Sequence, residues 1–63
     1  NMTLEALLEA AKAAGFTNVS ASTRLASGYW AVILYRGNAV VTAGDGDSFE
    51  AAISLALMRA QVK

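Results

Sequence analysis

Two aspartates, Asp45 and Asp47, stand one residue apart in the segment AGDGDSFEAA (43–52), the spacing that opens an EF-hand calcium loop. Such a loop also needs glycine at its sixth position and a bidentate acid at its twelfth, where this chain has Glu50 and Ala56. A phosphate site at a helix start would use free amide groups, but the segment has no lysine and its carboxylates repel an anion. The sequence therefore predicts no metal and no cofactor, and it leaves open whether loop 44–48 binds another ligand.

This chain has few residues of the types that enzymes use for catalysis. There is no cysteine and no histidine, so the serine and threonine hydroxyls lack their usual base. We expect Lys12 on a solvated helix face, and Lys63 is the last residue. Two carboxylates on a solvated loop have no apolar pocket to raise their pKa values. The sequence predicts that the chain is not an enzyme.

A structural role explains the acids of segment 43–52 better. Asp47 followed three residues later by Glu50 has the spacing of a capping box, and both acids favour the positive end of a helix dipole. The two glycines allow a tight entry into that helix. The segment is predicted to be a hinge from a strand into a helix.

Hydrophobic periodicity predicts five elements along the chain. Apolar residues recur at helical spacing from Leu4 to Ala11, with Thr3 as the N-cap and Gly15 as the residue that ends the helix. Alternation of apolar and polar residues marks the strands, and a Gly-Asn pair marks a hairpin. The predicted elements are a helix over 4–14, strands over 17–25, 29–36 and 39–43, and a helix over 48–61. The predicted fold class is α+β, a single domain (1–63) of order α-β-β-β-α, with a three-stranded antiparallel sheet and both helices packed on one face.

The second predicted helix has two apolar stripes rather than one. The first comprises Phe49, Ile53, Ala56, Leu57 and Ala60, and the second comprises Ala51, Leu55, Met58 and Val62. Ala52 is expected between them, with Arg59. One stripe can cover the sheet, whereas the other needs the first helix or a second copy of the chain.

The central strand, YWAVILYR (29–36), is apolar on both of its alternating sets. Helices on one face of the sheet can cover only one set, so the outer face should present either the set with Tyr29 and Tyr35 or the set with Trp30 and Leu34. We therefore predict a homo-oligomer, a dimer, that uses the open sheet face or the second helix stripe. The predicted interaction surface comprises Tyr29, Trp30, Ile33, Leu34, Tyr35, Leu55, Met58 and Val62.

Composition supports self-association and argues against charged partners. A chain of 63 residues with 56% apolar and 16% charged residues has neither disulfides nor a histidine or cysteine metal site to stabilise a small core. The five basic and five acidic residues are scattered, so nucleic acid is not the expected partner. No run of 18 apolar residues predicts a membrane span, and we expect a cytoplasmic protein.

The order α-β-β-β-α in about 60 residues is similar to the double-stranded RNA-binding domain, and VVTAGDGDSFEAAISLALMRA (40–60) resembles its third strand, loop and second helix. That resemblance implies a lysine cluster at the start of the second helix, but positions 48–52 read SFEAA. A second resemblance, to HicB-type antitoxins, lies in GYWAVILYRGNAVVTAGDGDSFEAAISLAL (28–57), although the acidic-proline segment of that family is missing. Small phage and prophage proteins often have a similar C-terminal part, in which a Gly-Asp pair leads into a helix that begins with Glu-Ala-Ala, here residues 50–52.

Two functions follow as hypotheses. The first is a small non-catalytic protein-interaction module, such as a phage or prophage accessory protein, that acts as a homo-oligomer. The alternative is a reduced nucleic-acid-binding module, in which aromatic side chains of the sheet stack on bases and two arginines contact phosphates. Its candidate residues are Tyr29, Trp30 and Tyr35 with Arg24 and Arg36.

Overall fold

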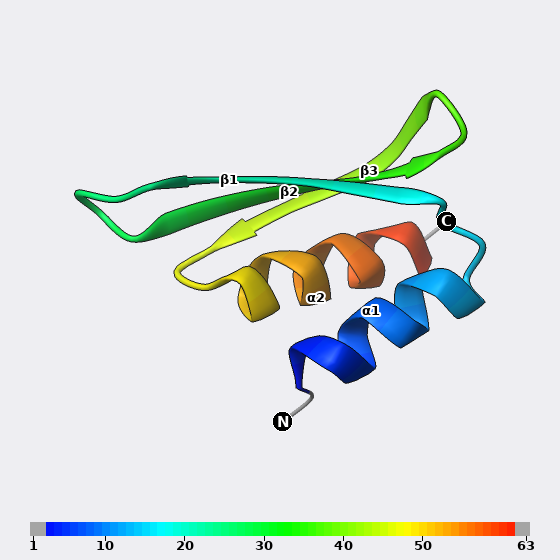
Figure 1. The fold of residues 1–63 in the computed structure, drawn as a ribbon, viewed down its shortest axis with the longest axis horizontal. Coiled ribbons are helices and arrows are strands. Elements are labelled where there is room, and N and C mark those ends of the chain that lie inside the picture. The colour runs from blue at the N-terminus through cyan, green and yellow to red at the C-terminus, as the bar shows by residue number, and fades with distance from the viewer. Residues whose placement is uncertain (1–2, 62–63) are drawn as a thin grey trace.

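The computed structural model describes residues 3–61 and confirms the predicted α-β-β-β-α order (Figure 1). The strands form one antiparallel sheet in the order β1-β2-β3, and both helices lie on the same face of it. The elements are α1 (Leu4–Ala13), β1 (Asn18–Arg24), β2 (Tyr29–Arg36), β3 (Ala39–Gly46) and α2 (Phe49–Gln61).

The two helices cover the sheet unequally. Helix α2 packs against β3 and β2, whereas α1 packs mainly against α2. Strand β1 is therefore the least covered strand, and most of its residues are exposed on both faces.

The ends of α1 follow the sequence prediction closely. The Thr3 hydroxyl accepts a hydrogen bond from the amide of Ala6 at 3.1 Å, as an N-cap does. At the other end, the amide of Phe16 donates to the Ala11 carbonyl and Gly15, at φ 92°, donates to the Lys12 carbonyl. These two bonds form a Schellman motif. They place the Phe16 side chain in the core.

The core lies between α2 and the helix-facing side of β2 and β3. Its buried apolar residues are Leu7, Ala11, Phe16, Val32, Leu34, Ala52, Ile53 and Ala56. Trp30 and Phe49 stack beside this cluster with their ring centroids 5.4 Å apart. Thr42 is the buried polar residue of the described chain, and its hydroxyl donates a 2.9 Å hydrogen bond to the Ala56 carbonyl. This bond satisfies the hydroxyl and ties β3 to α2.

Strand β3 is longer than predicted, because it runs to Gly46 rather than to residue 43. The prediction gave Gly44 and Gly46 to a tight entry into the helix, but both lie in the strand with φ outside the left-handed region. A Cβ on Gly44 would lie 2.5 Å from the Ala56 amide nitrogen and closer still to the Ala52 carbonyl oxygen. Gly44 is thus required for space, since it lets the backbones of β3 and α2 approach each other.

The N-cap of α2 also differs from the prediction. Ser48, not Asp47, accepts the hydrogen bond from the Ala51 amide, at 3.0 Å, and its carbonyl accepts from Ala52. Glu50 is then the second helical residue and cannot complete a capping box, which needs the acid at the third. The prediction placed the cap one residue too early because Asp47 and Ser48 are both good N-cap residues. Strand β3 runs to Gly46, and the helix then begins after Ser48.

The cap can be tested by substitution. We expect Ser48→Ala to lower the free energy of unfolding by about 1 kcal/mol, because the Ala51 amide loses its acceptor. Asp47→Ala should cost less, since the exposed Asp47 acts only through the helix dipole. Urea denaturation followed by circular dichroism measures both. An equal or larger loss for Asp47→Ala would contradict the assignment of Ser48 as the cap.

Candidate protein-interaction surface

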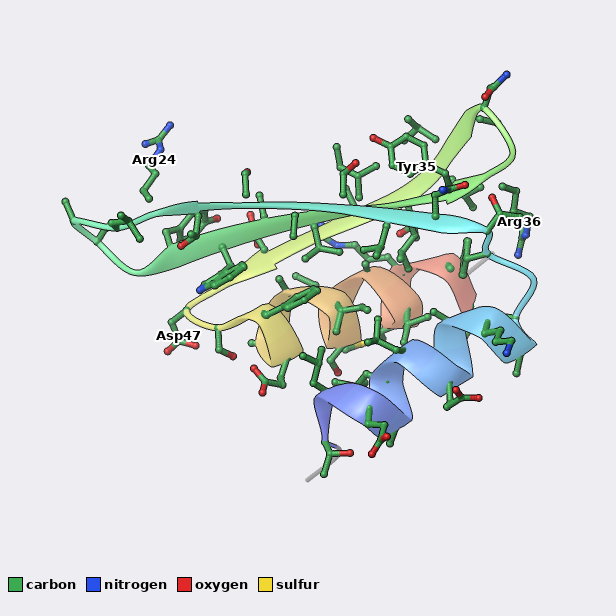
Figure 2. All side chains as sticks on the ribbon, in the orientation of Figure 1. Arg24, Tyr35, Arg36 and Asp47 are labelled. Carbon is green, nitrogen blue, oxygen red and sulfur yellow. The ribbon has the colours of Figure 1, made fainter. Side chains whose placement is uncertain are left out.

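The sheet face turned away from the helices carries a row of apolar side chains. Strand β2 alternates, with Val32 and Leu34 buried towards the helices and the Tyr29 set on the other face. Figure 2 shows Tyr35 on the side of the sheet opposite to both helices. We call the apolar residues of this face the open-face stripe, which comprises Tyr29, Ala31, Ile33, Tyr35, Val40, Val41 and Ala43.

A β-bulge adds one residue to this stripe. Leu34 pairs with Thr42 but Tyr35 pairs with Val40, so Val41 is the extra residue of β3. Thr42 is buried towards α2, which directs Val41 to the open face, and Val40 lies opposite Tyr35 on the same face. Val40 is 63% exposed and Val41 is 39% exposed. The period-two pattern of the sequence cannot reveal this arrangement, because a bulge interrupts it.

Polar residues border the open-face stripe. Residues of β1 that pair with the stripe residues of β2 lie on the same face, and they are all polar: Asn18, Ser20, Ser22 and Arg24. On the other side, Asp45 of β3 lies opposite Ala31. An apolar centre with a polar border is the usual anatomy of a protein–protein interface.

Tyr29 and Asp45 interact at one end of the stripe. The side-chain hydrogen bond to the Asp45 carboxylate raises the pKa of the Tyr29 hydroxyl above its ordinary value of 10.0, because the carboxylate favours the neutral phenol. Desolvation and the negative charge of Asp45 act in the same direction, while Arg24 and Arg59 oppose them. Neutral Tyr29 is therefore the form that the folded chain favours.

Asp45→Asn tests this pair. We expect the pKa of Tyr29 to fall, because the amide removes the negative charge, and ultraviolet titration of the phenolate measures it. The pKa of Tyr29 is higher in the folded chain than its ordinary value of 10.0, so the neutral phenol stabilises the fold relative to the unfolded chain. This stabilisation is complete below pH 10.0 and is lost as the pH rises through the folded pKa. An unchanged titration in Asp45→Asn would show that the two side chains do not interact. Asp47→Asn, the same change outside the sheet, is the control.

The structure divides the eight residues of the predicted interaction surface. Tyr29, Ile33 and Tyr35 come together on the open face. Trp30 and Leu34 face the helices, Trp30 in its stack with Phe49 and Leu34 in the core at 1% exposure. On α2, Met58 is exposed and Leu55 is half-buried, away from the stripe. Val62 lies outside the described residues.

The buried face of helix α2 is the first predicted stripe, widened on one side by Ala52. Ala52, which was expected between the two apolar stripes, is fully buried beside Ile53 and Ala56. The reason is the absence of a side chain on Gly44, which brings the α2 backbone against β3 on the side of Ala52. Helical periodicity ranks residues by hydrophobicity, so it underestimates small residues at such a close contact.

The two arginines of the predicted base-stacking platform do not lie together. Arg24 is on the open face, opposite Tyr29 in the register. Arg36 instead donates a 3.0 Å hydrogen bond to the Ala14 carbonyl, and its guanidinium lies 4.6 Å from the centre of the Phe16 ring. Figure 2 shows the two arginines at opposite ends of the sheet. The open face thus combines two tyrosines with one arginine.

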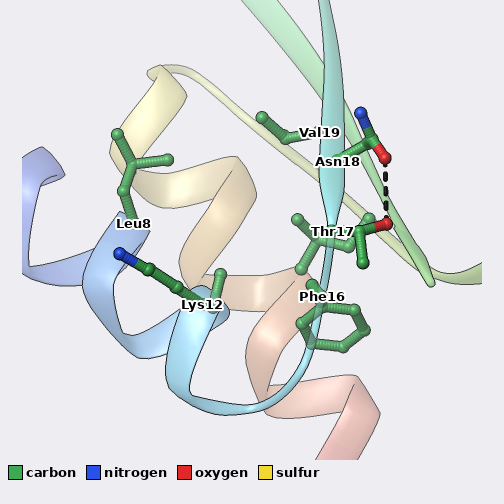
Figure 3. Close-up of a pocket in the computed structure, with 8 residues that line it drawn as sticks. Leu8, Lys12, Phe16, Thr17, Asn18 and Val19 are labelled. Carbon is green, nitrogen blue, oxygen red and sulfur yellow. Dashed lines mark hydrogen bonds between the residues drawn. The ribbon is translucent and has the colours of Figure 1, made fainter. Parts of the chain in front are cut away.

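Sequence reasoning missed a groove between α1 and β1 (Figure 3). It forms because α1 packs on α2 and leaves the helix-facing side of β1 uncovered. Leu8 and Val19, 39% and 41% exposed, contribute apolar walls. The groove encloses about 540 Å³ and is lined by Leu8, Ala11, Lys12, Phe16, Thr17, Asn18, Val19 and Leu34. An apolar residue at position 19 of an otherwise small and polar strand was the available sequence signal.

Within residues 3–61, no group of three or more His, Cys, Asp or Glu side chains is placed to hold a metal ion. Neither described helix is long and apolar enough to cross a membrane. Comparisons with protein-family models, with curated proteins and with solved structures found no match. The resemblance to double-stranded RNA-binding domains therefore extends to the order of elements and the antiparallel sheet, without a family match for it or for the HicB likeness.

Proposed function

We propose that this chain is a small non-catalytic protein-interaction module that works as a homo-oligomer and binds a partner protein through the open-face stripe. The observation that carries the proposal is the set of Tyr29, Ile33 and Tyr35 on a sheet face that neither described helix covers. A free monomer leaves this set in contact with water, and contiguous apolar surface of this kind is typical of interaction sites.

The chemistry of the stripe supports a protein partner. Tyrosine buries a large apolar ring at low entropic cost and keeps a hydroxyl for hydrogen bonding, which is why it is enriched at interfaces. The polar row of β1 lies along one side of the stripe, where it can stay solvated at the border of a contact. The lack of cysteine and histidine supports a role without catalysis. A phage or prophage origin is an expectation from the sequence likeness alone.

Photo-crosslinking tests the partner surface. A photoreactive phenylalanine at Tyr35, in the cells that express the protein, should crosslink to one defined protein because Tyr35 lies in the stripe. The same probe at Met58, an exposed position on α2, is the matched control and should not give that product. Ile33→Asp in the Tyr35 probe chain should abolish the product, since it places a charge at the centre of the stripe. Equal products from both positions, or none from Tyr35, would refute the proposed surface.

A nucleic-acid-binding module is the second candidate, favoured by the presence of Tyr29, Tyr35 and Arg24 on one face. Binding of this kind would weaken steeply with added salt, whereas an apolar protein contact would not. Fluorescence anisotropy with single-stranded and double-stranded RNA, at 50 and 200 mM salt, separates the two. Salt-sensitive RNA binding that Tyr35→Ala removes would favour this candidate over the protein-interaction module.

A further inference from the structure

The two edges of the sheet differ in how well they are protected from pairing with another strand. The β3 edge carries a bulge at Val41 and the charge of Asp45, two devices that discourage edge-to-edge pairing. Strand β1 pairs with β2 over seven residues without a bulge, and it has no proline and no charge before Arg24. The β1 edge is therefore an unprotected template for an added strand.

An added strand in antiparallel orientation could be a second β1, related by a two-fold axis. Directly opposite residues of antiparallel strands lie on the same face, so the register must pair residues of equal parity. Only an axis through Ala21 aligns all seven residues of Asn18–Arg24 with their copies. This register pairs Val19 with Thr23 and Ser20 with Ser22, and it sets Arg24 opposite Asn18 rather than opposite another arginine.

The same register brings the most exposed large apolar side chain of the described chain to the groove. Leu25 follows β1 directly and is 91% exposed. With the axis at Ala21, position 25 of one chain lies opposite Thr17 of the other, and Thr17 lines the groove. Odd-numbered positions of β1 face the helices, since Val19 and Ala21 pair with the buried Leu34 and Val32. Leu25 lies in the turn 25–28 directly after this row, where the Arg24 carbonyl accepts from the amides of Ser27 and Gly28. Its exposed side chain is therefore at the end of the strand that this register brings beside Thr17 of the other copy.

We infer that the homo-oligomer is a two-fold dimer in which β1 pairs antiparallel with β1 of a second copy, and Leu25 of each copy occupies the groove between α1 and β1 of the other. This inference rests on the proposed homo-oligomer and names its contact. The groove has apolar walls at Leu8 and Val19, so an aliphatic side chain is a suitable occupant. Pairing through β1 leaves the open-face stripe of each copy free for the partner protein.

Substitutions at the groove contact give the first test, by analytical ultracentrifugation at micromolar concentration. The wild-type chain should be a dimer, and Leu25→Ser should raise the dimer dissociation constant about a hundredfold, because two buried leucines are lost per dimer. Val40→Ser, the matched loss of an exposed apolar residue on the open face, should leave the constant within about twofold. Circular dichroism should show both variants folded, since each position is exposed.

A charge swap at the axis gives the second test. Ala21→Lys and Ala21→Glu should each be monomeric, because each sets two like charges opposite one another. An equimolar mixture should recover a heterodimer, which a general loss of folding cannot produce. A monomeric wild-type chain, or a failure of the mixture to associate, would overturn the inference. Loss of the dimer in Val40→Ser but not in Leu25→Ser would place self-association on the open face, which refutes this contact while the proposed homo-oligomer stands.

Discussion

Gly44→Ala is expected to destabilise the fold more than any other single methyl addition at a glycine of this chain. The new Cβ would meet the Ala52 carbonyl oxygen and lie 2.5 Å from the Ala56 amide nitrogen. Both atoms belong to the α2 backbone, so the whole helix would have to move away from β3. We expect a loss of about 3 kcal/mol. That is comparable with the total stability of a domain of this size, roughly 3–9 kcal/mol.

Thermal unfolding measures this loss, with an expected fall in the melting temperature of about 15 °C. Gly28→Ala is the control, because a Cβ there meets nothing within 4 Å but must adopt φ +70°. Its cost should be limited to the backbone strain of about 1 kcal/mol. Gly46→Ala should fall between the two, since its Cβ would meet the Ala51 side chain at 2.9 Å rather than backbone. A Gly44→Ala chain as stable as Gly28→Ala would show that α2 does not depend on this close approach.

Leu34→Ala should have the second large effect, and it should act on stability rather than on binding. Leu34 is 1% exposed in the core, so its truncation removes transfer free energy and leaves a cavity. We expect a loss of about 3 kcal/mol in the free energy of unfolding, measured by urea denaturation. The adjacent Ile33 lies on the open face and provides a matched control. Ile33→Ala should lose about 1 kcal/mol, because the half-buried side chain removes less surface from water.

The two variants should separate further in a binding assay. Ile33→Ala is expected to weaken the photo-crosslink formed at Tyr35, since Ile33 and Tyr35 share the open-face stripe. Leu34→Ala, measured at a temperature where it is still folded, should retain that crosslink. Equal stability losses for Leu34→Ala and Ile33→Ala would contradict the assignment of the two faces of β2. A crosslink lost in Leu34→Ala alone would contradict the open face as the partner surface.

Much of the fold was predictable because local sequence signals agree with the tertiary structure. The Thr3 cap and the ending at Gly15 and Phe16 use bonds between residues at most five apart, so the sequence contains them completely. Strand β2 was predicted over the observed Tyr29–Arg36, because its β-branched and aromatic residues lie between turn residues. The α2 boundary was within one residue of the prediction, although the cap was assigned to the wrong neighbour.

The candidate site was only partly predictable, because it depends on which face of β2 the helices cover. Both alternating sets of β2 are apolar, so hydrophobicity alone cannot choose between the Tyr29 set and the Trp30 set. The choice comes from packing: Trp30 stacks on Phe49, and Val32 and Leu34 are buried in the same cluster as Ile53. That packing leaves Tyr29, Ile33 and Tyr35 on the open face.

The residues alone were enough to predict the order of elements, the first helix with its caps and the central strand, and they lack the side chains for common catalytic or metal chemistry. Tertiary structure decided the role of Gly44 within segment 43–52, where the missing side chain permits a close contact of β3 with α2 rather than only a tight entry into the helix. It also decided the bulge at Val41 and the groove beside β1. The physical reason is that caps and periodicity arise from neighbours in the chain, whereas close approach, strand register and uncovered faces arise from residues far apart in it.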